Sequence, residues 1–279
     1  MAPSAGESSA ADSSASSSRR ALGALGALVR ASAARELQYR ANFFASLLGT
    51  VFWLGMAMLT VHIFYAHTTT LGGWTFWETV VLLGVFNALV GVIEGVLRPG
   101  IGSLPDEIRH GSLDLILARP IDPQVYLSIR DIDIWRVLDV VLGLSVSIYA
   151  LHRLGRAIDL PGAAAFAITF ATAIVVLYSV WVALMSLAYW LVAVENLSTV
   201  FDSLFEAARY PASAYPTALR LVFVFLLPIA WTTTTPASAL VGRLAPSGVV
   251  KALLVSALSL IISRAIWRMG LRRYTSAGG

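Results

Sequence analysis

The sequence contains no cysteine, and this absence removes several kinds of chemistry at once. Disulfides, thiolate metal sites, cysteine nucleophiles and lipidated cysteine anchors are all excluded. Histidine is also scarce: its four copies stand apart at positions 62, 67, 110 and 152, so a histidine metal site is not expected. No H-E-x-x-H or G-x-S-x-G pattern occurs, so nothing in the chain indicates an enzyme.

Charged side chains are few, making up 13% of the 279 residues against roughly 25% in an ordinary soluble domain. Apolar residues make up 57% and are gathered into long blocks. About 20 apolar residues in a helix cross a hydrocarbon core about 30 Å thick. Because several blocks reach that length, we expect an all-α, polytopic membrane protein. The net charge of +4 is small and dispersed, so nucleic acid is not an expected partner.

The chain also lacks a phosphate-binding loop. The pattern G-x-x-x-x-G-K-[ST] does not occur, and the single lysine, Lys251, follows no Gly-rich turn. We therefore expect no directly bound cofactor. If the protein works with ATP, the ATPase must be a separate chain.

The first residues differ in composition from the rest. Residues 1–20 are rich in Ser and Ala and cannot bury enough surface to offset the entropy of ordering, so we expect a disordered tail. Segment 21–41 combines apolar residues with arginines and fits an amphipathic helix on the cytoplasmic face of the membrane. A cleavable signal peptide is the alternative, although its apolar run would be short and arginines crowd its far side. We treat 21–279 as a single transmembrane domain.

Six apolar segments are the expected transmembrane spans, at about 43–65, 76–97, 137–151, 163–194, 219–235 and 247–267. The third is short and contains Asp139, and the fourth is longer than one crossing requires. Trp74 and Trp77 stand where an aromatic belt belongs, at the start of the second span.

Basic residues set the expected orientation. With the N-terminus inside, sixteen of the twenty fall in cytoplasmic segments, which include 98–136 and 195–220. The others are Arg153, Arg156, Arg243 and Lys251. An even number of spans agrees with basic residues at both ends of the chain. We therefore expect both termini in the cytoplasm.

The polar segment 98–136 contains the most informative pattern. Its helix-capping residues predict three short helices, and these residues are Ser103 with Asp106, Gly111, Ser112 and Asp122-Pro123. The middle helix, 113–118, would present leucine and isoleucine side chains in a loop that should face water. A docking element for another protein accounts for this, and so does a helix packed on its own membrane domain.

The run from Ile108 to Pro120 resembles the segment after the second span in the ABC type-2 transporter permease family. In that family a Gly-Thr/Ser-Leu-Glu/Asp-x-Leu-Leu-x-x-Pro pattern forms the loop that meets the ATPase subunit. The resemblance implies a coupling role for Ile108, Arg109, Gly111, Ser112, Leu113, Asp114, Leu117 and Pro120. Segments 35–43, 195–197, 209–211 and 267–274 are also similar to a six-span bacterial branch described as an ABC-2-like efflux permease.

This resemblance implies the membrane-spanning subunit of an ABC exporter in the bacterial cytoplasmic (inner) membrane. Such a permease forms a homo- or heterodimer, surrounded by membrane lipid, and works with two copies of an ATPase subunit that bind ATP and Mg²⁺. A secondary carrier or channel remains an alternative, although no internal repeat supports it. A membrane assembly or regulatory subunit that transports nothing is the other. The sequence does not indicate the substrate.

The second span contains a stripe of small and polar residues, Gly84, Asn87, Gly91 and Glu94, at three- and four-residue spacing. The stripe could face a substrate pathway or a partner permease. Packing inside the domain, with Glu94 paired to Arg98 one turn on, is the favoured interpretation. Asp139 with Arg136 is a second expected pair.

The segment around the fifth expected span is rich in proline and threonine. Pro228 and the run 232–236, four threonines and a proline, suit a broken or re-entrant helix in which hydroxyls satisfy freed backbone groups. Arg209-Tyr210-Pro211 and Tyr215-Pro216 fit loop punctuation, and a second ATPase contact is the alternative.

Overall fold

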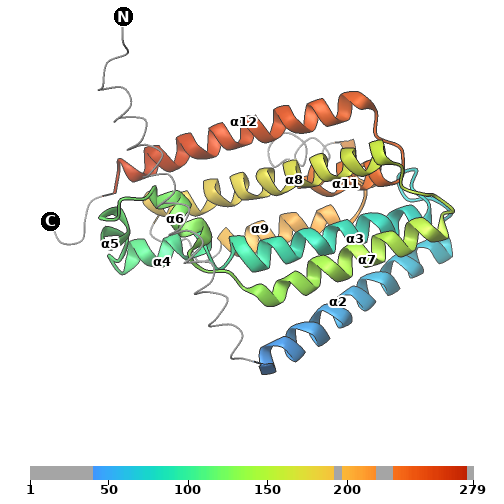
Figure 1. The fold of residues 1–279 in the computed structure, drawn as a ribbon, viewed down its shortest axis with the longest axis horizontal. Helices are drawn as coiled ribbons and strands as arrows, with labels where there is room; N and C mark the ends of the chain where they lie inside the picture. The colour runs from blue at the N-terminus through green and yellow to red at the C-terminus, as the bar shows by residue number, and fades with distance from the viewer. Residues whose placement is uncertain (1–39, 192–196, 218–228, 275–279) are drawn as a thin grey trace, which may run out of the picture.

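A computed structural model describes residues 40–191, 197–217 and 229–274 (Figure 1). The expected tail 1–20 lies outside these residues, as does nearly all of the expected amphipathic helix 21–41. The last residues of the expected span 163–194 and the first ten of 219–235 also lie outside them.

Every regular element within the described ranges is a helix. Five of these helices are long and apolar enough to cross a membrane. They are α2 (Arg40–His67), α3 (Phe76–Val92, continued by a π-helical turn, Ile93–Leu97), α7 (Val137–Arg153), α8 (Leu160–Ser186) and α12 (Pro246–Leu271). The all-α membrane fold expected from composition is thus confirmed.

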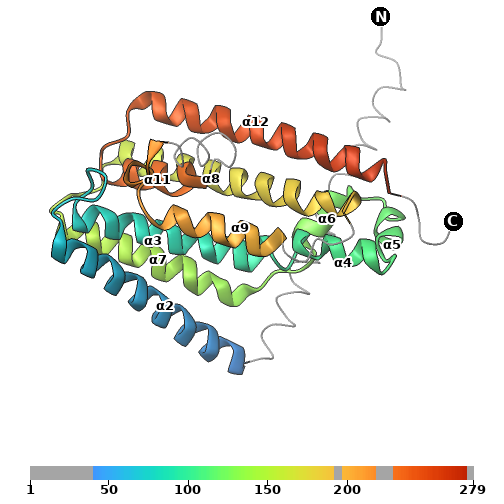
Figure 2. The same cartoon turned by 180° about the vertical axis from the view of Figure 1, so that it is seen from behind.

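The two ends of the helix bundle differ. Three short helices, α4 (Leu104–Arg109), α5 (Leu113–Leu117) and α6 (Pro123–Arg130), gather at one end, here called the α5 end (Figures 1 and 2). The tight turn between α2 and α3 lies at the opposite end, here called the Gly72 end. Helix α2 begins and α12 finishes at the α5 end, so the described chain starts and stops on the same side.

The long helices pack as two groups. Helix α3 lies along α7 and beside α2, and α8 lies along α12 and α11 (Ile229–Leu240). The apolar stretch of α3 is 72% buried, whereas those of α2 and α12 are 17% buried. Helix α3 is therefore the central helix. The exposed apolar side chains on α2 and α12, such as Phe52 (62% exposed) and Ile261 (67%), suit contact with lipid.

The contact between α3 and α7 is close because glycines face it. A Cβ atom added to Gly84 would lie less than 3.0 Å from the Gly143 carbonyl oxygen, and one added to Gly143 would meet the α3 backbone in the same way. Ser147 of α7 donates to the Val81 carbonyl at 3.0 Å. Inside lipid, helices associate through such close packing and hydrogen bonds, since the hydrophobic effect does not draw them together.

Helix α9 (Leu197–Glu206) corrects the expectation of a cytoplasmic segment at 195–220. Asp202 of α9 pairs with Arg98 at 2.7 Å, at the α5 end. The next turn stacks Phe205 on Phe86, halfway along α3, with ring centroids 4.9 Å apart. Ser213 then donates to the Gly72 carbonyl at 2.6 Å. The segment 197–213 therefore runs the length of α3, from the α5 end to the Gly72 end.

The chain after Ser213 comes back to the same end. Arg243, just after α11, donates to the Gly73 carbonyl at 2.8 Å and pairs with Glu78 at 2.9 Å. Within the described residues, the fifth passage between the ends is therefore 197–213, and the first ten residues of the expected span 219–235 lie outside them. The backbone is extended at Tyr210 and Pro211, so it covers the distance with fewer residues than a helix needs.

Cysteine labelling tests this arrangement, and the native chain offers no competing thiol. We expect cysteines at Ala66, Gly155 and Ser213 to react with an impermeant maleimide added to intact cells, because all three positions are exposed at the Gly72 end. A cysteine at His110, exposed at the α5 end, should react only after the membrane is opened. Protection of position 213 alongside labelling at 66 would return 195–220 to the cytoplasm.

Candidate functional site

Helix α5 exposes only part of the apolar surface that was expected to face water. Leu113 is 0% exposed and Ile116 4%, and both belong to the hydrophobic core. Leu115 is 72% exposed. A docking partner can therefore touch Leu115, whereas Leu113 holds the helix to its own domain. Packing on its own domain fits Leu113 and Ile116, and docking of another protein at Leu115 stays a prediction.

The helices α4, α5 and α6 form a layer at the α5 end of the bundle. The other residues of the expected coupling motif lie in this layer. Ile108 and Leu117 are half-buried against the core, Ser112 and Asp114 are half-buried, and Arg109 and Pro120 are exposed. Gly111 has φ of +69°, the left-handed conformation expected where the first short helix ends. The motif is therefore one connected layer, exposed on the side facing away from the bundle.

The expected caps are partly wrong. Asp122 caps α6 as predicted, accepting from the backbone N–H groups of Gln124 and Val125 at 3.0 and 3.2 Å. Ser103 and Ser112 cap nothing, because their own backbones are already helical, whereas a capping residue is usually extended. The Ser103 hydroxyl donates to the Gly100 carbonyl at 2.9 Å, and that of Ser112 to the Glu107 carboxylate.

An ion pair joins α4 to α6. Arg130 donates to Glu107 at 2.6 Å and to the Ser103 hydroxyl at 3.1 Å. Burial acts to raise the pKa of Glu107, but hydrogen bonds from Ser112 and Arg130 outweigh it, so this pKa lies below its usual range. The Glu107 carboxylate is therefore charged at neutral pH and holds the layer together.

Helix α6 is also fastened to the long helices behind it. Arg264 of α12 binds both carboxylate oxygens of Asp122 and donates to the Gln124 side-chain oxygen at 2.5 Å. The Gln124 amide donates to the hydroxyl of Tyr178, on α8, at 2.9 Å. The hydrogen bonds from Arg264 are the main reason that the pKa of Asp122 lies below its usual range.

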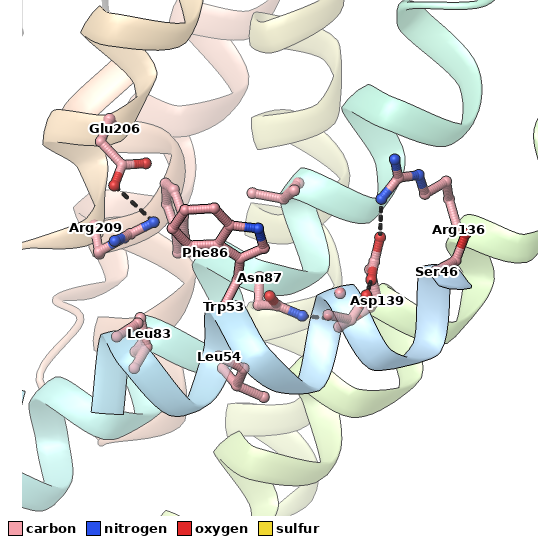
Figure 3. A pocket seen from close by; sticks show the side chains of 14 residues that line it. Ser46, Trp53, Leu54, Leu83, Phe86, Asn87, Arg136, Asp139, Glu206 and Arg209 are labelled. Atoms are coloured by element: carbon pink, nitrogen blue, oxygen red, sulfur yellow. Dashed lines mark hydrogen bonds and ion pairs between the residues drawn. The ribbon is translucent and has the colours of Figure 1, made fainter. Parts of the chain in front are cut away.

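A second feature, here called the lateral groove, lies between α2 and α9. It consists of two adjoining cavities of about 450 and 530 Å³. The side chains that line both are Trp53, Phe86, Val90, Glu206 and Arg209 (Figure 3). Trp53 is 66% exposed, so the groove opens on the α2 side. Glu206 and Arg209 pair at 2.6 Å beside the midpoint of α3, where charged groups in a membrane protein normally mark a functional path.

A chain of ion pairs runs from the groove toward the α5 end. Arg98 binds both Asp202 of α9 and Glu94 of α3, at 2.7 and 2.9 Å. Arg136 lies 3.8 Å from Glu94 and 3.3 Å from Asp139, whose carboxylate also accepts from Thr50 of α2. The Glu94–Arg98 and Arg136–Asp139 pairs were predicted from spacing; the links to α9 and α2 were not.

The stripe on α3 divides into two kinds of position. Gly84 and Gly91 pack against α7: a Cβ atom on Gly91 would lie 2.8 Å from the Arg136 carbonyl oxygen. Asn87 and Glu94 line the lateral groove. Asn87 also donates to the Asp139 carbonyl at 2.8 Å (Figure 3). The glycines thus match the packing interpretation, and the two polar residues stand where the pathway interpretation needs them.

The threonine run of α11 has a role that the sequence only half indicates. Thr233 donates to the Ala208 carbonyl at 2.7 Å, and Thr234 accepts from the Ala212 backbone N–H at 3.3 Å. These hydroxyls satisfy freed backbone groups as expected, but the groups belong to the irregular 207–212 segment and not to α11 itself. Arg209 lies beside the middle of α3, 5.3 Å from the centre of the Phe86 ring, and Tyr210-Pro211 interrupt the helical path after it, as loop punctuation would.

Comparison with known proteins identifies the family of this chain. A family profile described as "ABC-2 family transporter protein" matches residues 51–278. The chain belongs to the ABC-2 transporter family. No similar curated protein and no similar solved structure was found. The protein is therefore a multi-pass membrane protein and the permease component of an ABC transporter.

The ABC-2 match also bears on catalysis and on metal binding. Permeases of this family are membrane components that usually work with an ATPase partner, and catalysis is not their part. In the ranges that the structure describes, no group of three or more His, Asp or Glu side chains could hold a metal ion. The layer of α4, α5 and α6 and the lateral groove are the two features of the described residues on which the proposal below is built.

The two kinds of position on α3 are separable by substitution. We expect Gly91→Leu to lower the melting temperature and the detergent yield of the permease, because overpacking costs about 1–3 kcal/mol. Asn87→Leu should melt close to wild type, since it loses only one hydrogen bond. The control is Gly55→Leu on α2, where a Cβ atom meets nothing within 4 Å. Equal melting temperatures for Gly91→Leu and Gly55→Leu would contradict the packing assignment.

The threonine contacts predict a second stability effect. Thr233→Val keeps the volume but leaves the buried Ala208 carbonyl without its partner, at a cost of about 1–3 kcal/mol. Thr233→Ser retains the hydroxyl and serves as the control. Thermal unfolding in detergent should rank Thr233→Val clearly below Thr233→Ser. The reverse order would mean that packing of the methyl group, and not the hydrogen bond, holds this segment.

Proposed function

We propose that this permease moves a substrate across the bacterial cytoplasmic membrane using ATP hydrolysed by a separate subunit. Two ATPase subunits, each binding ATP and Mg²⁺, dock at the α5 ends of a homo- or heterodimer of permeases. Both termini and the α5 end face the cytoplasm. The direction of transport is outward, as the resemblance to efflux permeases implies.

One observation carries the proposal: the layer of α4, α5 and α6 is fixed on its inner side and open on its outer side. Leu113 and Ile116 are buried, while Leu115 of the same five-residue helix is 72% exposed. An apolar side chain held in this way at the expected cytoplasmic end suits burial in a partner protein. The chain itself has no phosphate-binding loop, so the partner must bring one.

The lateral groove is the proposed route of the substrate. Its walls combine exposed aromatic surface at Trp53 with the Glu206–Arg209 pair beside the middle of α3. Charged groups at this depth are costly beside lipid and are normally retained where they face water or a ligand. Asn87 and Glu94, the polar residues of the predicted stripe, lie on the same route.

Docking is tested by Leu115→Asp. A carboxylate in place of the exposed leucine would have to lose its water on docking, so we expect capture of the ATPase subunit by the tagged permease to fall about tenfold or more. The matched control is Leu160→Asp, because Leu160 is 84% exposed at the Gly72 end. Leu113→Asp is not a suitable probe, since it places a charge in the core and should impair folding.

Three results bear on the proposal. Loss of capture in Leu115→Asp with normal yield, and full capture in Leu160→Asp, supports docking at α5. Undiminished capture in Leu115→Asp removes α5 from the interface. Failure of the wild-type permease to capture any ATPase contradicts the function itself and favours a carrier or a non-transporting subunit.

A further inference from the structure

The layer of α4, α5 and α6 is connected to the two groups of long helices in two different ways. Along the chain, it leaves α3 at Arg98 and enters α7 after Arg136, so both covalent connections go to the α3–α7 group. These connections are short and close together, because the Asp133 N–H donates to the Gly95 carbonyl at 2.8 Å. A push on α5 therefore reaches the α3–α7 group through the backbone.

The α8–α12 group receives no backbone connection from this layer. Its polar links to the layer include side-chain contacts to α6, made by Arg264 of α12 and Tyr178 of α8, and an electrostatic contact of Tyr274, just after α12, with Asp114 of α5. Arg264 binds Asp122 through two nitrogens and also reaches Gln124, which Tyr178 holds from the other side. Ser128, one turn along α6, is also hydrogen-bonded to the Tyr178 hydroxyl, at 2.9 Å. Both helices of the group thus hold one turn of α6.

The Arg264–Asp122 contact joins two helices that are each held by further contacts. Asp122 is the N-cap of α6, so a force on its carboxylate acts on the helix start and not on a loose side chain. The far end of α6 is held to α4 by Arg130 and Glu107 at 2.6 Å. On the receiving side, α12 packs along α8, and its Gly270 leaves no room for a Cβ atom beside Tyr189, in the 3₁₀ turn that follows α8. These contacts give a displacement of α6 a direct path to α12.

We infer that Arg264 and Asp122 are positioning residues that transmit movement of the ATPase-bound layer to the α8–α12 group. With the pair intact, a displaced α5 carries both groups of long helices, one through the backbone and one through this contact. With the pair broken, the α3–α7 group still follows through the backbone, and the α8–α12 group follows less, because only apolar packing and the weaker polar contacts remain. This inference rests on the proposed docking of an ATPase at α5, and it adds how the docked subunit moves the permease.

The test needs no knowledge of the substrate. Single cysteines at Val137 on α7 and Ile261 on α12, exposed by 56% and 67%, can carry spin labels in the otherwise cysteine-free chain. The distance between the labels is measured in the full permease–ATPase complex, without nucleotide and after trapping with ATP and vanadate. We expect a clear shift in wild type, and loss of at least about half of that shift in Arg264→Gln and Asp122→Asn.

The variants are chosen to separate transmission from stability. Asn at position 122 can still accept the two backbone N–H groups that the cap requires, so Asp122→Asn removes the charge and keeps the helix start. Arg268→Gln is the matched control: it lies one turn further along α12, and Arg268 has no ion pair among the described residues. If Arg264→Gln does not fold, Asp122→Asn alone decides.

The outcomes are distinct. A reduced shift in Arg264→Gln and Asp122→Asn, with ATPase capture and hydrolysis retained and Arg268→Gln like wild type, supports transmission through the pair. A full shift in both variants overturns it. Loss of ATPase capture in both variants also overturns it, because the pair would then shape the docking surface instead. Failure of the wild-type permease to capture the ATPase subunit contradicts the proposed function. This capture is measured before any spin label is introduced.

Discussion

The close contact of α3 with α7 is the constraint on which the rest of the structure depends. Glycines at 84, 91 and 143 let the two backbones approach, and this brings the end of α3 next to the start of α7. The segment between them must then fold back on itself, which it does as α4, α5 and α6. Because both of its ends are fixed to one group of helices, side chains alone can connect it to the other group. The positions of Asp122 and Gln124 follow from that requirement.

Charges inside the bundle follow a consistent pattern. Arg98, Arg136 and Arg209 each contact at least one carboxylate, and Arg98 and Arg209 also lie over aromatic rings. Such pairing offsets the cost of taking charge out of water, and breaking one partner away is more costly than the pair is stabilising. The ion-pair chain across α9, α3, α7 and α2 therefore acts as a single unit that connects elements far apart in the sequence.

Local signals were the part of this structure that could be predicted. Gly111 and Asp122 act within one turn of the backbone, and the long apolar runs report length and composition, so helices such as α3 and α12 were expected close to where they lie. The exposed face of α5 could not be predicted, because a five-residue helix is too short for a periodic pattern to show which side is buried. The Arg264–Asp122 contact joins residues 142 apart in sequence and leaves no local trace.

The fifth passage shows the limit most clearly. Hydropathy favoured 219–235 over 197–213, because the latter contains Asp202, Glu206 and Arg209. A hydropathy scale counts each of these charged residues as a separate free-energy cost of insertion. It does not register that Asp202 pairs with Arg98 or that Arg209 lies over the Phe86 ring of α3. The similarity of 209–211 to the permease branch was visible in the sequence. Only the fold shows that these residues lie halfway along the bundle.

That same passage has a consequence for how the protein is made. Helices such as α2, α3 and α8 are long and apolar enough to leave the translocon for lipid one by one as they are synthesised. Helix α9 has ten residues and two carboxylates, so it cannot partition alone. Arg98 is already present when Asp202 is synthesised, but Thr233 and Thr234 of α11, which bind the segment just after α9, are synthesised later. The segment 197–213 therefore reaches its final contacts only after the chain through α11 has emerged from the ribosome.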